Sequence, residues 1–96
     1  MSPTNKKKLN KLRKSLDNLD NSFIKLVKKR TNLVNEVLKL KDYKNQIVDQ
    51  KRIQFILRNI KKKSLKNNID PKITNRIWKN MIWSYIDYER KNFKKK

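Results

Sequence analysis

The sequence predicts an all-α fold of three helices, of which the first is long. From Leu9 to Leu40, apolar residues recur at alternating spacings of three and four, which is typical of the seam of a packed helix. No segment shows the alternation of apolar and polar residues expected of a strand, and no internal repeat is visible. The seam positions are Leu9, Leu12, Leu16, Leu19, Phe23, Leu26, Leu33, Val37 and Leu40. We therefore expect residues 1–96 to form a single helical domain.

The first helix is predicted to run from near Asn5 to about Lys41, with loose tails at residues 1–4 and 94–96. Its seam covers 32 residues, which as an α-helix measures about 48 Å. A compact monomer of this chain length is only about 25 Å across. The far end of the helix therefore needs a cover, and a second copy of the chain is the simplest one.

The second helix is predicted to begin after Asp49, because residues 42–46 break the apolar pattern and aspartate is a good N-cap. The pair Asn67-Asn68 supplies the left-handed turn that glycine normally provides. The inward positions of this second helix are Arg52 or Ile53, followed by Ile56, Leu57 and Ile60.

The third helix is predicted to begin at Asp70-Pro71, with the aspartate as cap and the proline at the first helical position. It runs to about Phe93 and ends in a basic tail. Its inner face is marked by Ile77, Trp78, Met81, Ile82, Tyr85, Ile86, Glu89 and Phe93.

The composition limits the possible functions. The chain has no glycine, cysteine or histidine, which excludes glycine-rich phosphate loops and disulfides and argues against zinc or haem ligation. We expect no metal and no cofactor, so an enzyme built from this chain must act through fixed charges and shape. No signal peptide and no apolar run of membrane-spanning length is present, so we expect a cytoplasmic protein with no membrane partner.

The formal charge of +20 has two interpretations. One is a nucleic-acid or acidic-membrane partner. The other is genome composition, because 22 of the 28 basic residues are lysine, and Lys, Asn and Ile are all favoured by AT-rich codons. The net charge alone does not choose between them.

Three charged residues occupy positions where the helical pattern places apolar side chains. Arg30 stands in the middle of the first seam, and Glu89 continues the apolar face of the third helix. Lys41 lies nearly on the same line as Arg30, about 16 Å further along. A buried guanidinium needs an anion, which is either a protein carboxylate such as Glu89 or a small anionic ligand. Lys41 alone could equally be one more solvated lysine.

Two further arginines carry weaker signals. Arg52 lies at the edge of the apolar face of the second helix. Arg13 is ordinary by pattern and lies about 25 Å before Arg30 along the same helix. Arg13 could therefore reach a ligand at Arg30 only from a partner chain.

Segments 12–41, 48–57 and 69–89 together resemble the all-helical (type II) chorismate mutase family, and the resemblance extends over nearly the whole chain. These segments read LRKSLDNLDNSFIKLVKKRTNLVNEVLKLK, VDQKRIQFIL and IDPKITNRIWKNMIWSYIDYE. The resemblance implies an intertwined homodimer whose two active sites each take one arginine from the other protomer. It also implies an isomerase of the shikimate pathway that rearranges chorismate, a small dianion, to prephenate in aromatic amino acid biosynthesis.

The resemblance assigns catalytic roles to three residues. Arg30 would hold a substrate carboxylate, Lys41 would bridge a carboxylate and the ether oxygen, and Glu89 would face the ether oxygen from the other side. The bacterial enzymes usually have glutamine at position 89, and an ionised Glu89 could only accept a hydrogen bond. We therefore expect the reaction to run best at acidic pH, where a protonated carboxyl can donate.

The resemblance assigns substrate-binding roles to Arg13 from the partner protomer, and to Asp49 and Arg52. Two other binding positions depart from the family: Ile53 stands where glutamate usually binds the hydroxyl of chorismate, and Tyr85 replaces a small polar residue. Both changes resemble the isochorismate pyruvate lyases, which form salicylate and pyruvate on the same fold. The short loop before Asp49 looks more mutase-like, so the mutase is the first interpretation and the lyase the alternative.

A third interpretation is a basic helical module that binds nucleic acid and catalyses nothing. It accounts for the charge of +20. It does not account for the inward positions of Arg30 and Glu89, because phosphate contacts come from exposed side chains. We therefore place nucleic-acid binding, taken as the whole function, behind both enzyme interpretations.

Overall fold

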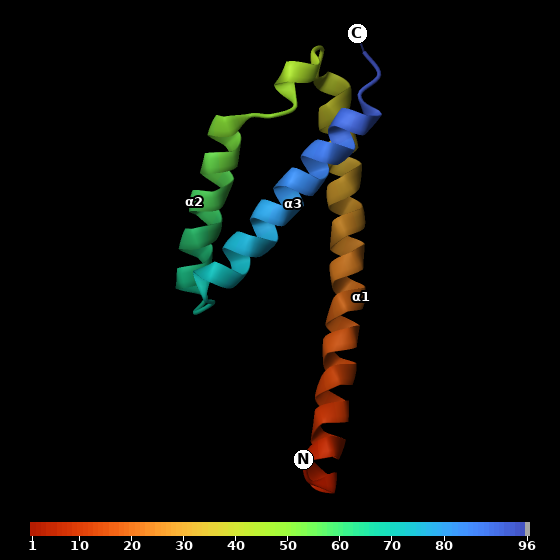
Figure 1. Ribbon diagram of the computed structural model, residues 1–96, viewed down its shortest axis with the longest axis vertical. Helices are drawn as coiled ribbons and strands as arrows, with labels where there is room; N and C mark the ends of the chain where they lie inside the picture. Colours follow the sequence, from red (N-terminus) through yellow and green to blue (C-terminus); the bar gives the residue numbers. More distant parts are fainter. Residues whose placement is uncertain (96) are drawn as a thin grey trace. The chain divides into compact units, whose positions relative to one another are not determined.

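The computed structural model describes residues 1–95 and consists of helices joined by short connections (Figure 1). The elements are α1 (Pro3–Leu40), the 3-10 turn η1 (Lys44–Gln46), α2 (Gln50–Lys66) and α3 (Pro71–Asn92). The described residues contain no strand, which confirms the predicted all-α class with a long first helix. The chain divides into two units, Met1–Leu33 and Val34–Lys96. Lys96, the end of the predicted C-terminal tail, lies outside the described residues.

The first unit begins with helix almost at once. Helix α1 starts at Pro3, so the predicted start at Asn5 is two residues late and the expected four-residue tail is too long. Ser2 explains the early start, because its Oγ accepts a hydrogen bond from the backbone N–H of Asn5 at 3.1 Å. A serine cap followed by a proline is a favourable helix start.

The apolar seam of the first unit remains open. Except for Leu9, which is partly buried, its large side chains are more than half exposed, and a single helix cannot bury its own stripe. The side chains concerned are Leu12, Leu16, Leu19, Phe23, Leu26 and Leu33. Within the described part of the chain, no helix is apolar enough over a sufficient length to cross a membrane.

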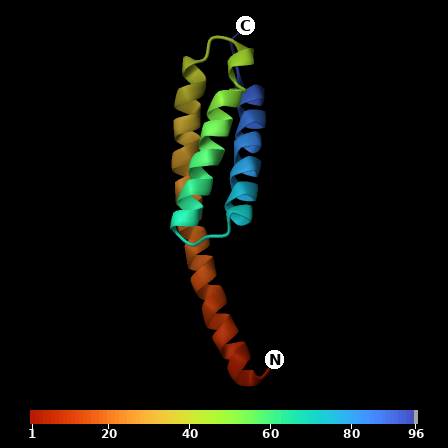
Figure 2. The same cartoon turned by 90° about the vertical axis from the view of Figure 1, so that its left-hand side faces the viewer.

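The second unit contains a small hydrophobic core. Its buried members are Leu38 near the end of α1, Ile47 in the following connection, and Ile82 and Ile86 of α3. Helices α2 and α3 pack against each other beside this core (Figures 1 and 2). Partly buried side chains complete it, and these are Val48, Ile53, Ile56, Leu57 and Phe93.

The ends of α2 and α3 follow the predicted signals. Asp49 and Asp70 have extended backbones and accept hydrogen bonds from Arg52 N and Lys72 N, both at 3.0 Å. Asn68 has a φ of 56°, so an asparagine does provide the left-handed residue after α2. Asn68 and Asp70 thus mark the connection at which α3 turns back along α2.

Candidate active site

A buried ion pair joins the residue after α1 to the last turns of α3. Lys41 Nζ donates a hydrogen bond to Glu89 Oε1 at 3.0 Å, and the two side chains are only 18% and 8% exposed. Glu89 shares the buried face of α3 with Ile82 and Ile86, as the helical spacing predicted. Two charges withdrawn from water are tolerated only when they are well paired. The structure thus brings together two of the three predicted catalytic residues.

A tight connection holds the backbone around Lys41. The N–H of Lys41 donates to Leu38 O at 3.2 Å where α1 ends. The side chain of Gln46 then reaches back, and its Oε1 accepts from Asp42 N at 2.8 Å and Tyr43 N at 2.9 Å. Lys41 is therefore positioned by a closed turn and not by a fraying helix end. No sequence pattern marked Gln46, because a side chain that bonds to the backbone before it leaves no periodic signal.

An open hollow with a volume of about 470 Å³ lies beside Lys41. Its wall includes Lys41 and Asp49, two of the predicted site residues, and Lys51 adds a second cation. The carboxylate of Asp49 caps α2 by accepting from Arg52 N. The other lining residues are Gln46, Val48 and Gln50. Two lysines at one hollow suit an anionic ligand.

The two neighbours in α2 are placed differently from each other. Arg52 is exposed, and its guanidinium carbon lies 5.4 Å from the centre of the Phe55 ring, a cation–π contact. Ile53 is half-buried and packs against the core of the second unit. Neither lines the hollow beside Lys41. The binding role predicted for Arg52 would require its side chain to turn from Phe55 towards that hollow.

Tyr85 belongs to an aromatic pair on α3. Its ring meets that of Tyr88 edge-on, with 6.4 Å between ring centres and 83° between ring planes. The hydroxyl of Tyr88 donates to Asn35 Oδ1 at 2.8 Å, which ties α3 to the last turns of α1. Tyr88 and Asn35 escaped prediction because neither lies on the apolar stripes that identified the helices.

The remaining predicted site residues, Arg30 and Arg13, lie in the first unit. Arg30 is half-buried, and its Nε is a buried donor without a hydrogen-bond partner among the described residues. A buried donor left unpaired costs free energy, so this nitrogen lacks the acceptor it needs. Glu89, the protein carboxylate considered as that acceptor, is already paired with Lys41. Arg13 is exposed.

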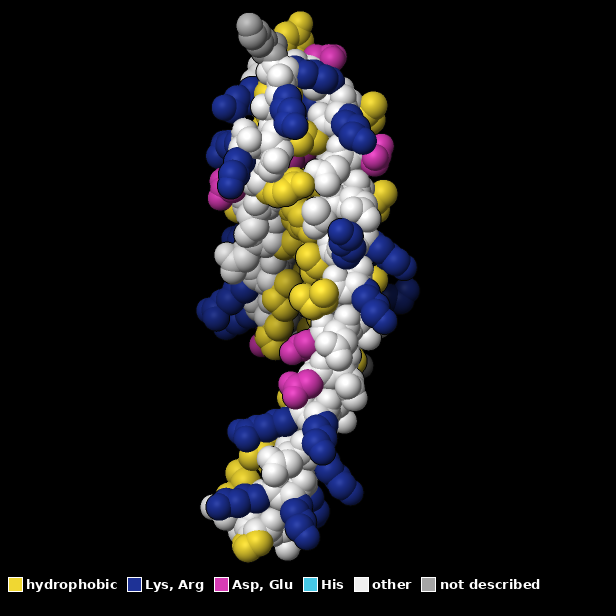
Figure 3. Space-filling view, turned by 90° about the vertical axis from the view of Figure 1, so that its right-hand side faces the viewer, with side chains coloured by type: hydrophobic (Ala, Val, Ile, Leu, Met, Phe, Trp, Pro, Cys, Tyr) yellow, Lys and Arg dark blue, Asp and Glu magenta, His cyan; other side chains and the backbone are white. Residues whose placement is uncertain are grey.

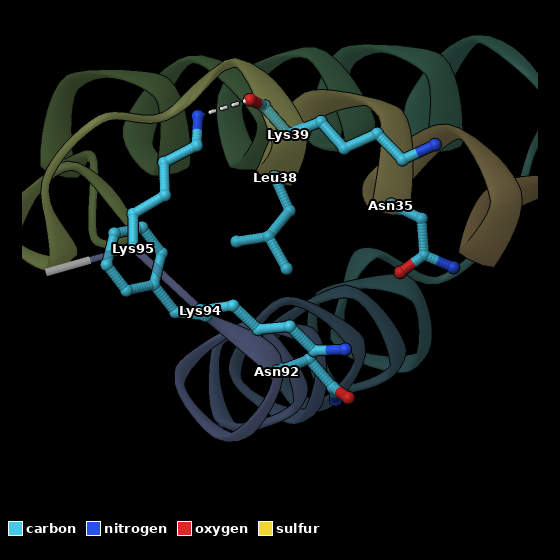
Figure 4. Close-up of a pocket in the computed structure, with 7 residues that line it drawn as sticks. Asn35, Leu38, Lys39, Asn92, Lys94 and Lys95 are labelled. Carbon is cyan, nitrogen blue, oxygen red and sulfur yellow. Dashed lines mark hydrogen bonds between the residues drawn. The ribbon is translucent and has the colours of Figure 1, made fainter.

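A second hollow, of about 390 Å³, involves none of the predicted site residues (Figure 4). Leu38 and Phe93 form its apolar part. Lys95 is held there, because its Nζ donates to Lys39 O at 2.6 Å and lies 3.8 Å from Asp42 Oδ1. The predicted loose tail is therefore anchored at Lys95. The polar lining residues are Asn35, Lys39, Asn92, Lys94 and Lys95.

Comparison with known proteins identifies the family. The sequence model of type II chorismate mutases matches residues 12–90, more than three quarters of the chain. The chain belongs to the chorismate mutase type II family. Comparisons with curated proteins and with solved structures give no match. The match confirms the resemblance seen in the sequence. It includes all the predicted site residues, of which Arg13 is the first and Glu89 the last.

Proposed function

We propose that the protein is a chorismate mutase, which works in the cytoplasm as a homodimer and needs no cofactor. The observation that carries the proposal is the family match over residues 12–90, because that range contains every candidate site residue. The buried contact between Lys41 and Glu89 supports it. These are the two residues that the resemblance assigns to the ether oxygen of the substrate.

The chemistry suits a chain without histidine or cysteine. Conversion of chorismate to prephenate is a one-step pericyclic rearrangement that needs no acid, base or nucleophile. It needs the dianion folded so that its reacting ends meet, and positive charge where the breaking C–O bond becomes negative. In our proposal Lys41 supplies that charge. Arg30 and the partner's Arg13 hold the two carboxylates through bidentate hydrogen bonds.

Glu89 can assist the proposed reaction only as a hydrogen-bond donor. In the substrate-free chain its carboxylate accepts a hydrogen bond from Lys41 Nζ. When substrate is bound, Lys41 turns towards the ether oxygen and a carboxylate of the substrate. A protonated Glu89 can then donate to the ether oxygen from the other side, whereas an ionised Glu89 can only repel the charge that develops there.

The open seam of the first unit supports a dimer. Side chains such as Leu16 and Leu19 are 57% and 61% exposed, and a second copy would remove them from water. Arg13 lies on the same segment and is exposed. The partner that covers the seam would therefore also deliver Arg13 to the site.

Isochorismate pyruvate lyase is the second candidate, and Ile53 is the observation that favours it. This side chain is apolar and half-buried against the core, so no carboxylate is present there to bind the hydroxyl of chorismate. Isochorismate carries its hydroxyl elsewhere on the ring and does not need that partner. The lyase reaction would use the same cations, because its substrate is also a dianion.

Product identification tests the proposal. The purified protein is incubated with chorismate and with isochorismate in separate reactions, and the products are separated by chromatography. Prephenate from chorismate is the expected result. Salicylate and pyruvate from isochorismate, without prephenate, would assign the lyase. An Arg30→Ala variant serves as the control for contaminating activity, and absence of all three products would contradict both candidates.

A further inference from the structure

The side-chain amide of Gln46 has its oxygen engaged and its nitrogen free. The Oε1 atom accepts from the backbone N–H groups of Asp42 at 2.8 Å and Tyr43 at 2.9 Å. Both partners are donors, so only the amide oxygen can face them, and this fixes which way the amide points. Its Nε2 donates to none of the described residues. Gln46 therefore presents an unused N–H donor in a defined orientation.

The two hydrogen bonds distinguish Gln46 from the other amide at the hollow beside Lys41. An exposed glutamine turns among several rotamers, and a ligand that binds it has to stop that motion. Two backbone groups hold the carbonyl of Gln46, so most of that motion is already removed in the free chain. Gln50 also lines the hollow, but no hydrogen bond within residues 1–95 fixes its side chain. Gln46 is thus the preorganised donor of the pair.

The surroundings of Gln46 offer few protein acceptors for its free nitrogen. Among the residues that line the hollow, Asp49 is the only acid, and its Oδ1 already accepts from Arg52 N. The chain has eight acidic residues against 28 basic ones, and acidic side chains are few beside Lys and Arg on the face seen in Figure 3. Lys41 and Lys51 line the same hollow. An anionic ligand is therefore the natural acceptor for the amide.

We propose that Gln46 binds the substrate, donating a hydrogen bond from Nε2 to the carboxylate that Lys41 contacts. The inference rests on the proposed function, because it takes the hollow beside Lys41 as the place of that carboxylate. A carboxylate has two oxygens, so the ammonium of Lys41 and the amide of Gln46 can each bond to one of them. Chorismate and isochorismate are both dianions, so the contact serves whichever of the two is the substrate.

The variant Gln46→Glu separates the two ends of the side chain. A carboxylate still offers oxygens to Asp42 N and Tyr43 N, so the turn should stay closed and the midpoint of urea unfolding should not fall. An ionised carboxylate has no N–H to donate to a ligand. Gln50→Glu is the matched control, because it makes the same change of charge at another exposed residue of the same hollow. Comparing the two variants separates the lost donor from general repulsion of a dianion.

The test is steady-state kinetics on the full-length variants, with the substrate that the unaltered protein converts. Gln46→Glu should raise KM about 10- to 100-fold, the effect of losing a hydrogen bond to a charged group. Gln50→Glu should raise KM at most about fivefold, the range for interactions between exposed charges. The kcat of Gln46→Glu should change little, because the contact is made in the ground state and the transition state alike.

Several outcomes would overturn the inference. Equal rises in KM for the two variants would assign the effect to charge alone. A fall in kcat without a rise in KM would limit Gln46 to holding the turn that follows Lys41. A marked loss of folding stability in Gln46→Glu would show that the turn needs more than an acceptor at this position. If the unaltered protein converts neither chorismate nor isochorismate, the proposed function fails as well, whereas the other outcomes, seen in an active protein, overturn this inference alone.

Discussion

The two units of the chain differ in how far they bury their apolar residues, although Val37 and Leu40 at the end of the seam are exposed in the second unit as well. In residues 34–95, Leu38, Ile47, Ile82 and Ile86 are at most 9% exposed, and the ion pair of Lys41 with Glu89 is largely buried. In residues 1–33, every seam side chain except Leu9 is more than half exposed. The second unit therefore has a small core and a largely buried ion pair, whereas the first presents an apolar face that requires another surface. In the proposed enzyme, the second unit would hold Lys41 at the ether oxygen, and the first unit would hold Arg30 and the surface that meets the partner chain.

The largest expected effect comes from breaking the ion pair of the second unit. Lys41→Ala leaves Glu89 buried without a cation, which should destabilise the fold by about 3–5 kcal/mol and lower kcat about 10²- to 10³-fold. Lys39→Ala is the control, because its pair with Glu36 is about 70% exposed on both sides and such pairs contribute about 0–1 kcal/mol. Urea unfolding and steady-state kinetics measure both effects. Equal stabilities for the two variants would show that the buried pair is unimportant.

The next largest effect concerns the exposed apolar seam of the first unit. Leu19→Glu puts a charge on the exposed seam, so it should dissociate the proposed dimer and lower activity about tenfold or more at micromolar protein. Asn21→Glu adds the same charge on the opposite side of α1 and should do neither. Sedimentation velocity gives the oligomeric state of each variant. A Leu19→Glu protein that sediments and reacts like the unaltered chain would exclude the seam as the dimer interface.

Part of this contrast could be read from the sequence, and part depended on the tertiary structure. The caps Asp49 and Asp70 and the left-handed Asn68 were predictable, because each acts on backbone within a few residues. The inward position of Glu89 followed from helical spacing in the same way. The pairing of Glu89 with Lys41 did not follow from helical spacing, because Lys41 is 48 residues away and only the packing of α3 brings the two together.

The same reason explains the features that were missed. The start at Pro3 was signalled by Ser2, but the apolar seam that guided the prediction begins only at Leu9. The contact between Tyr88 and Asn35 spans 53 residues and uses polar groups outside every apolar stripe. Local chemistry therefore fixed the helix ends, and long-range pairing fixed the site.

A third and smaller effect sharpens the role of Glu89. Glu89→Gln offers the ether oxygen a hydrogen-bond donor, which a carboxylate cannot do, so it should raise kcat by up to about tenfold. Steady-state kinetics on both proteins decide the matter, and an unchanged kcat would exclude Glu89 as a contact of the ether oxygen.

The smallest expected effect separates capping from catalysis. Asp49→Ala and Asp70→Ala each remove an N-cap and should each cost about 1 kcal/mol of stability. Only Asp49 lines the hollow beside Lys41, so only Asp49→Ala should also raise KM, because it loosens the backbone that the cap holds there. Thermal unfolding and steady-state kinetics on the two variants make the comparison. If Asp70→Ala raised KM as much, the effect would belong to stability alone.

The most direct test of the central claim mixes two inactive chains. Arg13→Ala removes the cation assigned to the partner, and Lys41→Gln removes the cation of the enclosed pair while keeping a hydrogen-bond donor to Glu89. If each site combines residues of two chains, refolding the two variants together should restore about a quarter of the unaltered activity, because half of the dimers then contain one intact site. No recovery from a mixture that forms mixed dimers would contradict a shared site.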